Sequence, residues 1–239
     1  MSYESEWQKV YGINRDPVRE ILIYPQLLYQ MGELEKATLV DLGCGNGGLI
    51  HRLLDRSFHK AVGLDVSQPF IDAANALISD PRVSFVRTDI TESLPLPDAS
   101  VDCVVSVFVL NEINQLTTVF SECGRILKPH GFGHFVVTHP FLVAQSILHE
   151  KYTGRPLGKL DGLMLYKSRE PFEYRFTIAN VSARYFQHTF EEYVDGVAAA
   201  GLTLSRLVEM QTDDPAFQEY EKYWSDREVP KYMYFRIGH

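Results

Sequence analysis

The sequence predicts an α/β fold, in which helices are wound onto both faces of a mostly parallel sheet, and two observations carry this prediction. Between residues 37 and 140, five short apolar runs of strand length alternate with segments of helical pattern. Successive parallel strands need a crossover, and a helix is its usual form. The chain of 239 residues, 45% hydrophobic and 23% charged, is long enough and apolar enough for one such domain.

The composition argues against several other classes of protein. A net charge of -8 is unlike that of a general nucleic-acid binder, which usually presents a basic face. The three cysteines, Cys44, Cys103 and Cys123, have neither a CxxC pairing nor a metal-ligand spacing, so no metal site is expected. The N-terminal residues are polar and acidic, unlike a signal peptide, and no apolar run reaches the roughly 18 residues of a membrane span. A soluble cytoplasmic protein is therefore expected.

The segment before the first strand is expected to be helical. Residues 3–14 suggest a short helix. A second helix should begin near Asp16 and Pro17, because Asp is a good N-cap and Pro suits the first helical position. Pro25 is expected to kink this second helix. Its apolar residues are compatible with one buried stripe: Val18, Ile21, Leu22, Leu27 and Leu28.

The repeated strand–loop–helix pattern begins at residue 37. Strands are expected at residues 37–43, 60–67, 83–89, 101–110 and 132–140, with helices at 47–56, 68–79 and about 115–127. The fourth strand is rich in β-branched residues and suits a central position that is buried on both faces. The last of these helices is expected to end at "KPHG", residues 128–131, where Pro and Gly would stop it.

The remainder of the chain departs from this pattern. Residues 141–187 are rich in Tyr, Phe, Arg and Gly, and we interpret them as an insertion over the active edge of the sheet. Two extended segments are expected around Ala179 and Asn180. A helix should follow between the N-cap Thr189 and Gly201. Residues 202–210 and 231–238 are expected to be the last two strands, paired with each other.

The stretch "LVDLGCGNGG", residues 39–48, is the first candidate binding element. Closely spaced glycines between a strand and a helix usually let the backbone approach a ligand, although a turn without a ligand is the alternative. No Gly-Lys-Ser/Thr follows, so a P-loop is excluded. Asp41 stands two residues before Gly43 and would repel a pyrophosphate. This carboxylate favours a ligand with an ammonium or sulfonium centre.

Acidic residues also end the next two strands. Asp65 could accept hydrogen bonds from ribose hydroxyls, although Ser67 and its neighbours could instead cap a helix. Asp89 could accept from an adenine amino group, with the Ile90 backbone N–H on a ring nitrogen, although an Asx turn is the alternative. Because the carboxyl ends of parallel strands line one crevice, three such acids together point to an adenosine-containing cationic ligand.

These motifs resemble those of the class I S-adenosylmethionine-dependent methyltransferases, in the right order over about residues 37–138. "LVDLGCGNG" resembles their first motif, "VGLDVS" the second, "VRTDI" the third and "LPLPDASVDCVVSVFVLNEI" the fourth region. "RILKPHGFGHFVV" is similar to their Leu-Lys-Pro-Gly-Gly segment. The resemblance implies a Rossmann-like doubly wound sheet of seven mostly parallel strands, with an antiparallel last strand and an inserted lid segment.

The same resemblance implies S-adenosyl-L-methionine as cofactor, with S-adenosyl-L-homocysteine as product. Asp41 and the loop from Gly43 to Gly47 would hold its methionine part, and Ser106 would lie beside it. Asp65 would bind the ribose, and Asp89 and Ile90 the adenine. N-terminal residues often fold over the cofactor in this family, so a cation there would suit the methionine carboxylate. The full set of expected cofactor residues is Tyr11, Arg15, Asp41, Gly43, Cys44, Gly45, Gly47, Asp65, Val66, Asp89, Ile90 and Ser106.

The acceptor side is less well marked in the sequence. His139, after the fifth strand, and His188, just before the last helix, are the acid–base candidates, because an imidazole could take a proton from a hydroxyl or ring N–H. Surface or hydrogen-bonding roles are the alternative for both. Tyr152 and Tyr166 in the insertion are candidate substrate contacts. Asn111 is another, and it stands where the family usually has His; His130 replaces a Gly of Leu-Lys-Pro-Gly-Gly.

The sequence thus predicts one methyltransferase domain over residues 1–239. Its parts would be N-terminal cap helices (1–36), a cofactor-binding core (37–138), a substrate lid (141–187) and a closing helix and strands (188–239). The expected acceptor is a small, cyclic or aromatic molecule methylated on O, N or C, by a monomer or homodimer that binds no nucleic acid. The alternatives are a quinone or isoprenoid-ring methyltransferase and a cofactor-binding protein without transferase activity. A dehydrogenase fits Asp41 and the glycine spacing poorly.

Overall fold

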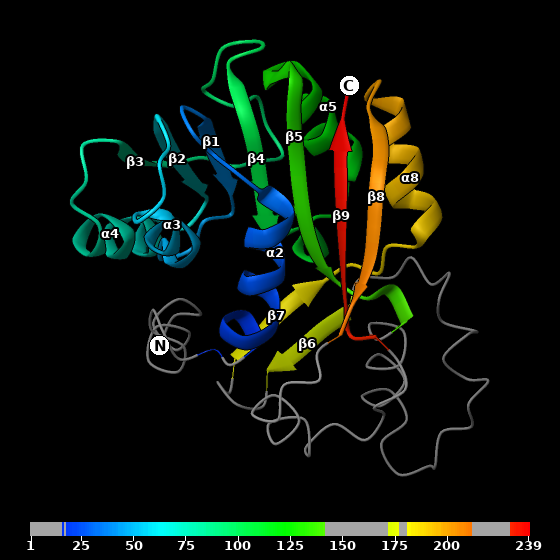
Figure 1. Cartoon of the computed structure of the whole chain (residues 1–239). Coiled ribbons are helices and arrows are strands. Elements are labelled where there is room, and N and C mark those ends of the chain that lie inside the picture. The colour runs from blue at the N-terminus through cyan, green and yellow to red at the C-terminus, as the bar shows by residue number, and fades with distance from the viewer. Residues whose placement is uncertain (1–15, 17, 142–171, 177–180, 212–229) are drawn as a thin grey trace.

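The computed structural model describes residues 16, 18–141, 172–176, 181–211 and 230–239 (Figure 1). The helix expected at residues 3–14 and most of the insertion at 141–187 lie outside these residues. The expected division into cap, core, lid and closing segments is therefore carried forward as a prediction.

A seven-stranded sheet forms the centre of the molecule, in the order β3-β2-β1-β4-β5-β9-β8 (Figure 1). The first five strands in this order are parallel to one another, whereas β9 is antiparallel to both β5 and β8. The predicted doubly wound fold with an antiparallel last strand is confirmed. The strands are β1 (Thr38–Leu42), β2 (Lys60–Asp65), β3 (Val83–Arg87), β4 (Val101–Val107), β5 (Leu127–Thr138), β8 (Thr203–Met210) and β9 (Tyr232–Gly238).

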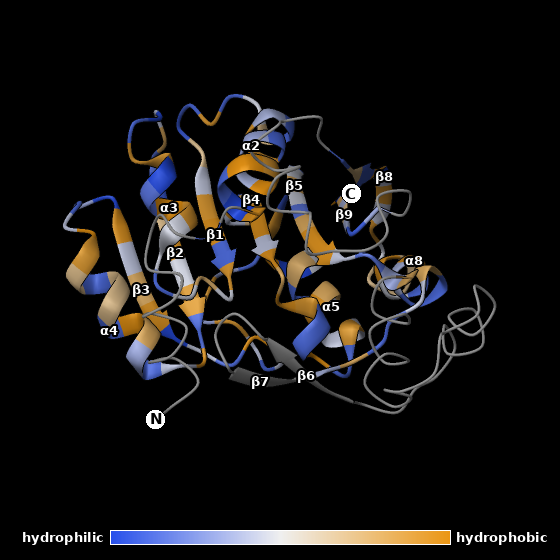
Figure 2. Ribbon diagram, turned by 90° about the horizontal axis from the view of Figure 1, so that it is seen from below, coloured by the Kyte–Doolittle hydropathy of each residue, from blue (hydrophilic) through white to orange (hydrophobic). Residues whose placement is uncertain are grey.

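Helices cover both faces of this sheet. Figure 2 shows α2 and α5 on opposite sides of it, with the hydrophobic colour of β4 between them. The described helices are η1 (Val18–Ile23), α2 (Tyr24–Met31), α3 (Gly48–Leu53), α4 (Gln68–Leu77), η2 (Leu110–Glu112), α5 (Leu116–Ile126) and α8 (Phe190–Ala199). The expected extended segments of the insertion form a separate antiparallel pair, β6 (Phe172–Phe176) and β7 (Val181–Tyr185).

Two hydrophobic cores sandwich the sheet. The core on the side of α5 and α8 includes Phe120, Phe135, Tyr193, Val197 and Phe235, and the core on the side of η1, α2 and α3 includes Leu22, Ile23, Leu27, Ile50 and Leu53. Of the apolar stripe predicted before the first strand, Val18, Leu22 and Leu27 are buried in the second core, and the partly buried Ile21 and Leu28 pack against it. This burial holds the N-terminal helices against the half of the sheet that carries the glycine loop.

The N-terminal helix differs in detail from its prediction. Asp16 caps it as expected: its Oδ1 accepts from the backbone N–H groups of Val18 at 3.0 Å and Arg19 at 3.4 Å. The first turns form a π-helix, and the α-helix begins at Tyr24, with Pro25 in its first turn. Pro lacks an N–H and suits that position. Near Pro25, where a kink was expected, the helix changes from a π-helix to an α-helix.

The helix before "KPHG" ends as predicted, since its last residue is Ile126, but the next strand begins earlier than predicted. β5 begins at Leu127 rather than at residue 132, and "KPHG" lies within it. Val101 pairs with Leu127 but Cys103 pairs with Phe132, so the intervening residues form a bulge in the strand. A bulge accepts the Pro and the Gly that a regular central strand would reject.

Candidate functional site

The glycine loop joins β1 to α3 at the carboxyl end of the sheet. Gly43, Gly45 and Gly47 have φ values of +72°, +53° and +81°. Gly43 also has no room for a side chain, because an added Cβ would lie 2.2 Å from Cγ2 of Val109. An added Cβ at Gly45 would meet nothing within 4 Å. Gly43 is therefore required by the protein's own packing, whereas the surface at Gly45 is open.

Asp65, at the end of β2, holds this loop from the side. Its Oδ2 accepts from the backbone N–H of Gly45 at 2.9 Å, and its Oδ1 accepts from that of Ser67 at 2.9 Å. The side chain of Ser67 in turn caps α4 by accepting from the Phe70 N–H. Ser67 is thus the helix cap that the sequence offered as the alternative, and ribose binding by Asp65 stays a prediction.

Asp41 lies beneath the loop in an unusual electrostatic setting. Its side chain is 4% exposed and makes no hydrogen bond within the described part of the chain. Burial, reinforced by the Asp65 carboxylate and opposed by Arg19, raises the pKa of Asp41 to about 7. A buried carboxylate with no partner is costly to ionise unless a cation compensates it. The site therefore favours a positively charged ligand.

The adenine side of the predicted site is open. Val66, directly after Asp65, is 59% exposed although it is apolar, and Ile90 is buried at the end of β3. Asp89 is exposed, and its Oδ1 accepts from the backbone N–H and hydroxyl of Thr91 at 2.9 and 2.7 Å. This is the Asx turn weighed as the alternative, and it fixes the carboxylate beside Ile90. Contact of these residues with adenine stays a prediction.

Ser106 and Cys44 are buried at the same edge of the sheet. The hydroxyl of Ser106 donates to the carbonyl of Leu42 at 2.9 Å and so ties the end of β4 to the end of β1. Burial, with contributions from Asp41 and Asp65, raises the pKa of the Cys44 thiol, which therefore stays protonated. Both residues shape the site, and their contact with a cofactor stays a prediction.

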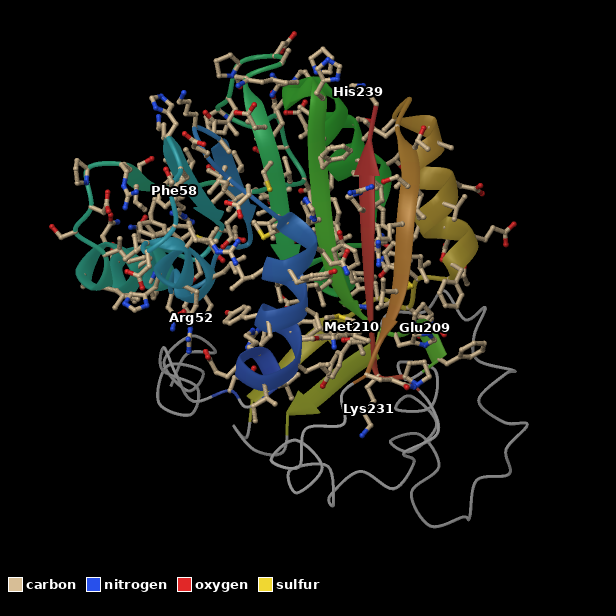
Figure 3. All side chains as sticks on the ribbon, viewed as in Figure 1. Arg52, Phe58, Glu209, Met210, Lys231 and His239 are labelled. Atoms are coloured by element: carbon tan, nitrogen blue, oxygen red, sulfur yellow. The ribbon has the colours of Figure 1, made fainter. Side chains whose placement is uncertain are left out.

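The N-terminal helix contributes Arg19, which the sequence did not single out. Its Nη1 donates to Oδ2 of Asp16 at 2.6 Å, and its guanidinium lies 5.2 Å from the centre of the Phe108 ring. Phe108 has a φ of +64°, which is rare for an aromatic residue and marks strain directly after β4. The next residue on η1, Glu20, pairs with Arg52 of α3, which Figure 3 labels. Tyr11 and Arg15, the expected cofactor contacts, lie outside the described residues.

His139 is fully buried after β5, and both of its ring nitrogens are used. Nε2 lies 3.2 Å from Oε1 of Glu209, and Nδ1 accepts from the backbone N–H of Phe141 at 3.3 Å. Burial lowers the pKa of His139, while Glu209 acts in the opposite direction. Figure 3 places Glu209 at the end of β8, beside Met210 and Lys231. In this arrangement His139 joins strand ends, and it could act as a base only if one of these bonds broke.

His188 is placed differently. Its Nε2 donates to the carbonyl of Ile113 at 2.7 Å, which leaves Nδ1 as the basic nitrogen of the neutral ring. Burial lowers the pKa of His188, so the neutral form is favoured. Asn111 is also buried, and its side-chain oxygen accepts from the backbone N–H of Thr138 at 3.1 Å. Substrate contact by Asn111 stays a prediction.

Three further expectations concern the tyrosines of the insertion, metal binding and a membrane span. Tyr152 and Tyr166, the expected substrate contacts of the insertion, lie outside the described residues. Within the described ranges, no group of three or more His, Cys, Asp or Glu side chains is arranged to hold a metal ion. No helix among the described residues is long and apolar enough to cross a membrane.

The fold and this site together define a class of protein. The sheet order reverses between β1 and β4, and ligands of open α/β sheets bind outside the strand ends at such a point. The residues there suit S-adenosylmethionine: an open loop at Gly45, a buried unpaired carboxylate at Asp41 for a cationic group, and a carboxylate at the end of β2 for a ribose. These features are those expected of a Rossmann-like domain that binds a cationic adenosine derivative.

Comparison with known proteins specifies the class further. Residues 40–135 match the family model described as "Methyltransferase domain". A Mycolicibacterium smegmatis protein named a probable S-adenosylmethionine-dependent methyltransferase is 31% identical over 122 residues, 51% of this chain and 44% of that protein. The 27-O-demethylrifamycin SV methyltransferase of Amycolatopsis mediterranei is 33% identical over 97 residues, 39% of this chain and 35% of that enzyme.

A solved structure supports the same assignment at the level of fold. The S-adenosylmethionine-dependent methyltransferase from Mesorhizobium loti superimposes with a TM-score of 0.72 at 20% identity, over 90% of this chain and 96% of that one. Residues 40–135 are thus a class I S-adenosylmethionine-dependent methyltransferase domain, with S-adenosylmethionine as the cofactor of that class. The chain spans about half the length of the curated relatives that it matches, 50% of the first, 46% of the second and 44% of the third.

Replacing Arg19 with leucine is expected to weaken cofactor binding selectively. Arg19 supplies a cation near Asp41, where the methionine part is expected, so its loss should cost about 1.5 kcal/mol, roughly tenfold in Kd, for S-adenosylhomocysteine. Binding of methylthioadenosine, which lacks the carboxylate, should change by less than about twofold. Calorimetric titration of both ligands measures this, with Arg52→Leu as the control on the neighbouring helix. Equal losses for the two ligands would show that Arg19 supports the fold rather than the carboxylate.

Proposed function

We propose that the whole protein is an S-adenosylmethionine-dependent methyltransferase that moves a methyl group to O, N or C of a small, cyclic or aromatic molecule. The observation that supports this most directly is Asp41, a buried carboxylate without a hydrogen-bond partner in the described chain, beneath an open glycine loop. The net charge of -8 supports a diffusing small acceptor rather than a nucleic acid. The same proposal includes a cytoplasmic location and a monomeric or homodimeric state.

The chain's own residues would bind and orient the two reactants. When bound, S-adenosylmethionine supplies a methyl group on a positively charged sulfur, which an acceptor lone pair can attack in line. Asp41 would hold the cationic methionine part, Asp65 the ribose, and Asp89 with Ile90 the adenine. Because the methyl group is already activated, most of the catalytic effect would come from bringing the acceptor atom close to it. A base is needed only where the acceptor must lose a proton early.

Two experiments test the proposal, the first on cofactor binding and the second on methyl transfer. We expect S-adenosylhomocysteine to bind in calorimetric titration and NAD⁺ not to bind. We then expect label from methyl-labelled S-adenosylmethionine to enter at least one compound of a cell metabolite extract. A protein that binds S-adenosylhomocysteine but labels nothing would be a cofactor-binding protein without transferase activity. Label found only in apolar quinones or isoprenoid rings would favour the other alternative.

Of the two base candidates, His188 is more compatible with the geometry. We expect His188→Gln to lower kcat by more than about tenfold, because the amide can still donate to the Ile113 carbonyl but cannot take a proton. His139→Gln should lower kcat by less than about threefold, since both nitrogens of His139 already have hydrogen-bond partners, Glu209 on β8 and the backbone N–H of Phe141. The rate of methylation of the labelled compound measures both. If neither variant departs from wild type by more than a few-fold, no histidine acts as base.

A further inference from the structure

Gln187, on the segment between β7 and α8, carries a buried polar atom that the proposed cofactor site does not use. The residue is 5% exposed. Its Nε2 donates to the Pro140 carbonyl at 2.9 Å and lies 3.5 Å from the His188 carbonyl. Its Oε1 is buried and has no hydrogen-bond partner among the described residues. A buried acceptor left without a donor is uncommon in folded proteins and calls for an explanation.

The orientation of this amide is fixed by its neighbours. Amide oxygen and nitrogen are assigned from their hydrogen bonds, and both groups at the Gln187 nitrogen are carbonyls, which can only accept. A flipped amide would place Oε1 against these two carbonyl oxygens and lose both interactions. Oε1 is therefore the atom that lacks a partner, and a compensating group must bring an N–H or O–H.

Gln187 lies where the methyl acceptor, rather than the cofactor, is expected to bind. Pro140 follows the end of β5. The neighbouring Phe186 donates its backbone N–H to the carbonyl of Asn111 at 2.7 Å, and Asn111 comes just after the end of β4. Asn111 is two residues beyond Val109, whose side chain packs against Gly43 of the glycine loop. Gln187 thus sits at the carboxyl ends of β4 and β5, on the same edge of the sheet as the glycine loop.

We propose that Oε1 of Gln187 accepts a hydrogen bond from the methyl acceptor and so positions it, which makes the acceptor a molecule with an N–H or O–H at or next to the methylated atom. This inference rests on the proposed transferase function and narrows its substrate class. It disfavours a bare alkene or ring carbon as acceptor, because such a group has no donor to satisfy Oε1. Gln187 is a positioning residue in this role, and the bond to Pro140 keeps its amide in place.

The test compares wild type with Gln187→Met, which has nearly the same shape but neither polar atom. Each protein is incubated with methyl-labelled S-adenosylmethionine and a cell metabolite extract, and the labelled compound is purified for kinetics. We expect wild type to label an O or N atom, or a carbon next to an O–H or N–H group. In Gln187→Met, kcat/KM for that compound should fall about 10- to 100-fold while Kd for S-adenosylhomocysteine stays within about twofold.

Two further variants separate positioning from folding. Gln187→Glu offers, when protonated, an O–H for the Pro140 carbonyl and a free oxygen for the acceptor. Its kcat/KM relative to wild type should therefore recover as the pH is lowered from about 8 to about 6. Gln26→Met is the matched control, because it removes another side-chain amide bond, that from Gln26 Nε2 to the Gln211 carbonyl, on the N-terminal helix. It should retain wild-type kinetics.

The results distinguish failure of the Gln187 role from failure of the transferase proposal. Labelling by Gln187→Met at a kcat/KM within about threefold of wild type, or a labelled carbon with no neighbouring donor, overturns the role of Gln187 but leaves the transferase intact. Binding of S-adenosylhomocysteine without any labelling by wild type overturns the transferase proposal and the inference with it. Loss of S-adenosylhomocysteine binding in both Gln187→Met and Gln187→Glu would assign Gln187 to the fold instead.

Discussion

Asp41→Asn is expected to change ligand binding and stability in opposite directions. The carboxylate is buried, has no hydrogen-bond partner among the described residues and faces the place expected for a cationic group. The variant should bind S-adenosylmethionine about 10- to 100-fold more weakly, because a charge-assisted contact is replaced by a neutral one. The ligand-free variant should nevertheless be more stable than wild type at about pH 8, since no buried charge has to be maintained.

The pH dependence follows from the raised pKa of Asp41. Burial and Asp65 raise it from 3.8 to about 7, so between these values the folded protein holds a proton that the unfolded chain has released. The free energy of unfolding should then fall as the pH rises from about 4 to about 7, by up to about 4 kcal/mol. Asp41→Asn removes this loss, and a gain of about 2 kcal/mol at pH 8 is reasonable because its amide is itself buried. Wild-type affinity for the cofactor should rise over the same range, whereas that of the variant should not.

Chemical unfolding and calorimetric titration across this pH range measure both effects. Asp55→Asn is the matched control, because Asp55 is an exposed carboxylate just beyond the end of α3 and should alter neither quantity. A variant that loses stability and binding together would indicate that Asp41 supports the loop in its charged form. The assignment of Asp41 to a cationic ligand would then have to be abandoned.

The sequence predicted those features of the fold and the candidate site that depend on residues close together in the chain. The order of strands and helices, the glycine loop and the acids Asp41, Asp65 and Asp89 all follow from residues near one another in the chain, and the sheet brings these acids to one edge. The helix stop at "KPHG" was predicted correctly, but the strand start at residue 132 was too late, because "KPHG" lies within β5 as a bulge opposite β4. Such a bulge depends on a partner strand, which propensity cannot supply.

The residues that the sequence missed share one property: their roles depend on long-range contacts. Arg19 and Phe108 lie far apart in the chain and meet only after folding, and the positive φ of Phe108 has no glycine to signal it. Gln187 resembles any polar loop residue until its burial and its bond to Pro140 are known. The one local signal available was the spacing of Asp16 and Arg19, which suits an ion pair on one helical turn.

The glycine loop allows the fold and the ligand site to be tested separately. In Gly43→Ala, a left-handed φ costs about 1 kcal/mol and the new Cβ would overlap Cγ2 of Val109 at 2.2 Å. Together with about 1–3 kcal/mol of overpacking, the free energy of unfolding should fall by about 2–4 kcal/mol. Adding Val109→Ala should return part of this loss, so that the double variant is about 1–2 kcal/mol more stable than the sum of the single changes predicts.

Gly45→Ala should weaken cofactor binding more than it lowers the stability of the protein. Its added Cβ has no neighbour within 4 Å, so only the backbone strain of about 1 kcal/mol should appear in the ligand-free protein. If the open space above Gly45 belongs to the cofactor, the methyl group should occupy it and raise the Kd for S-adenosylhomocysteine by more than about tenfold. Unfolding in denaturant and calorimetric titration of the same samples measure the two losses. Normal binding by Gly45→Ala would place the cofactor elsewhere, because no ligand can share that volume with a side chain.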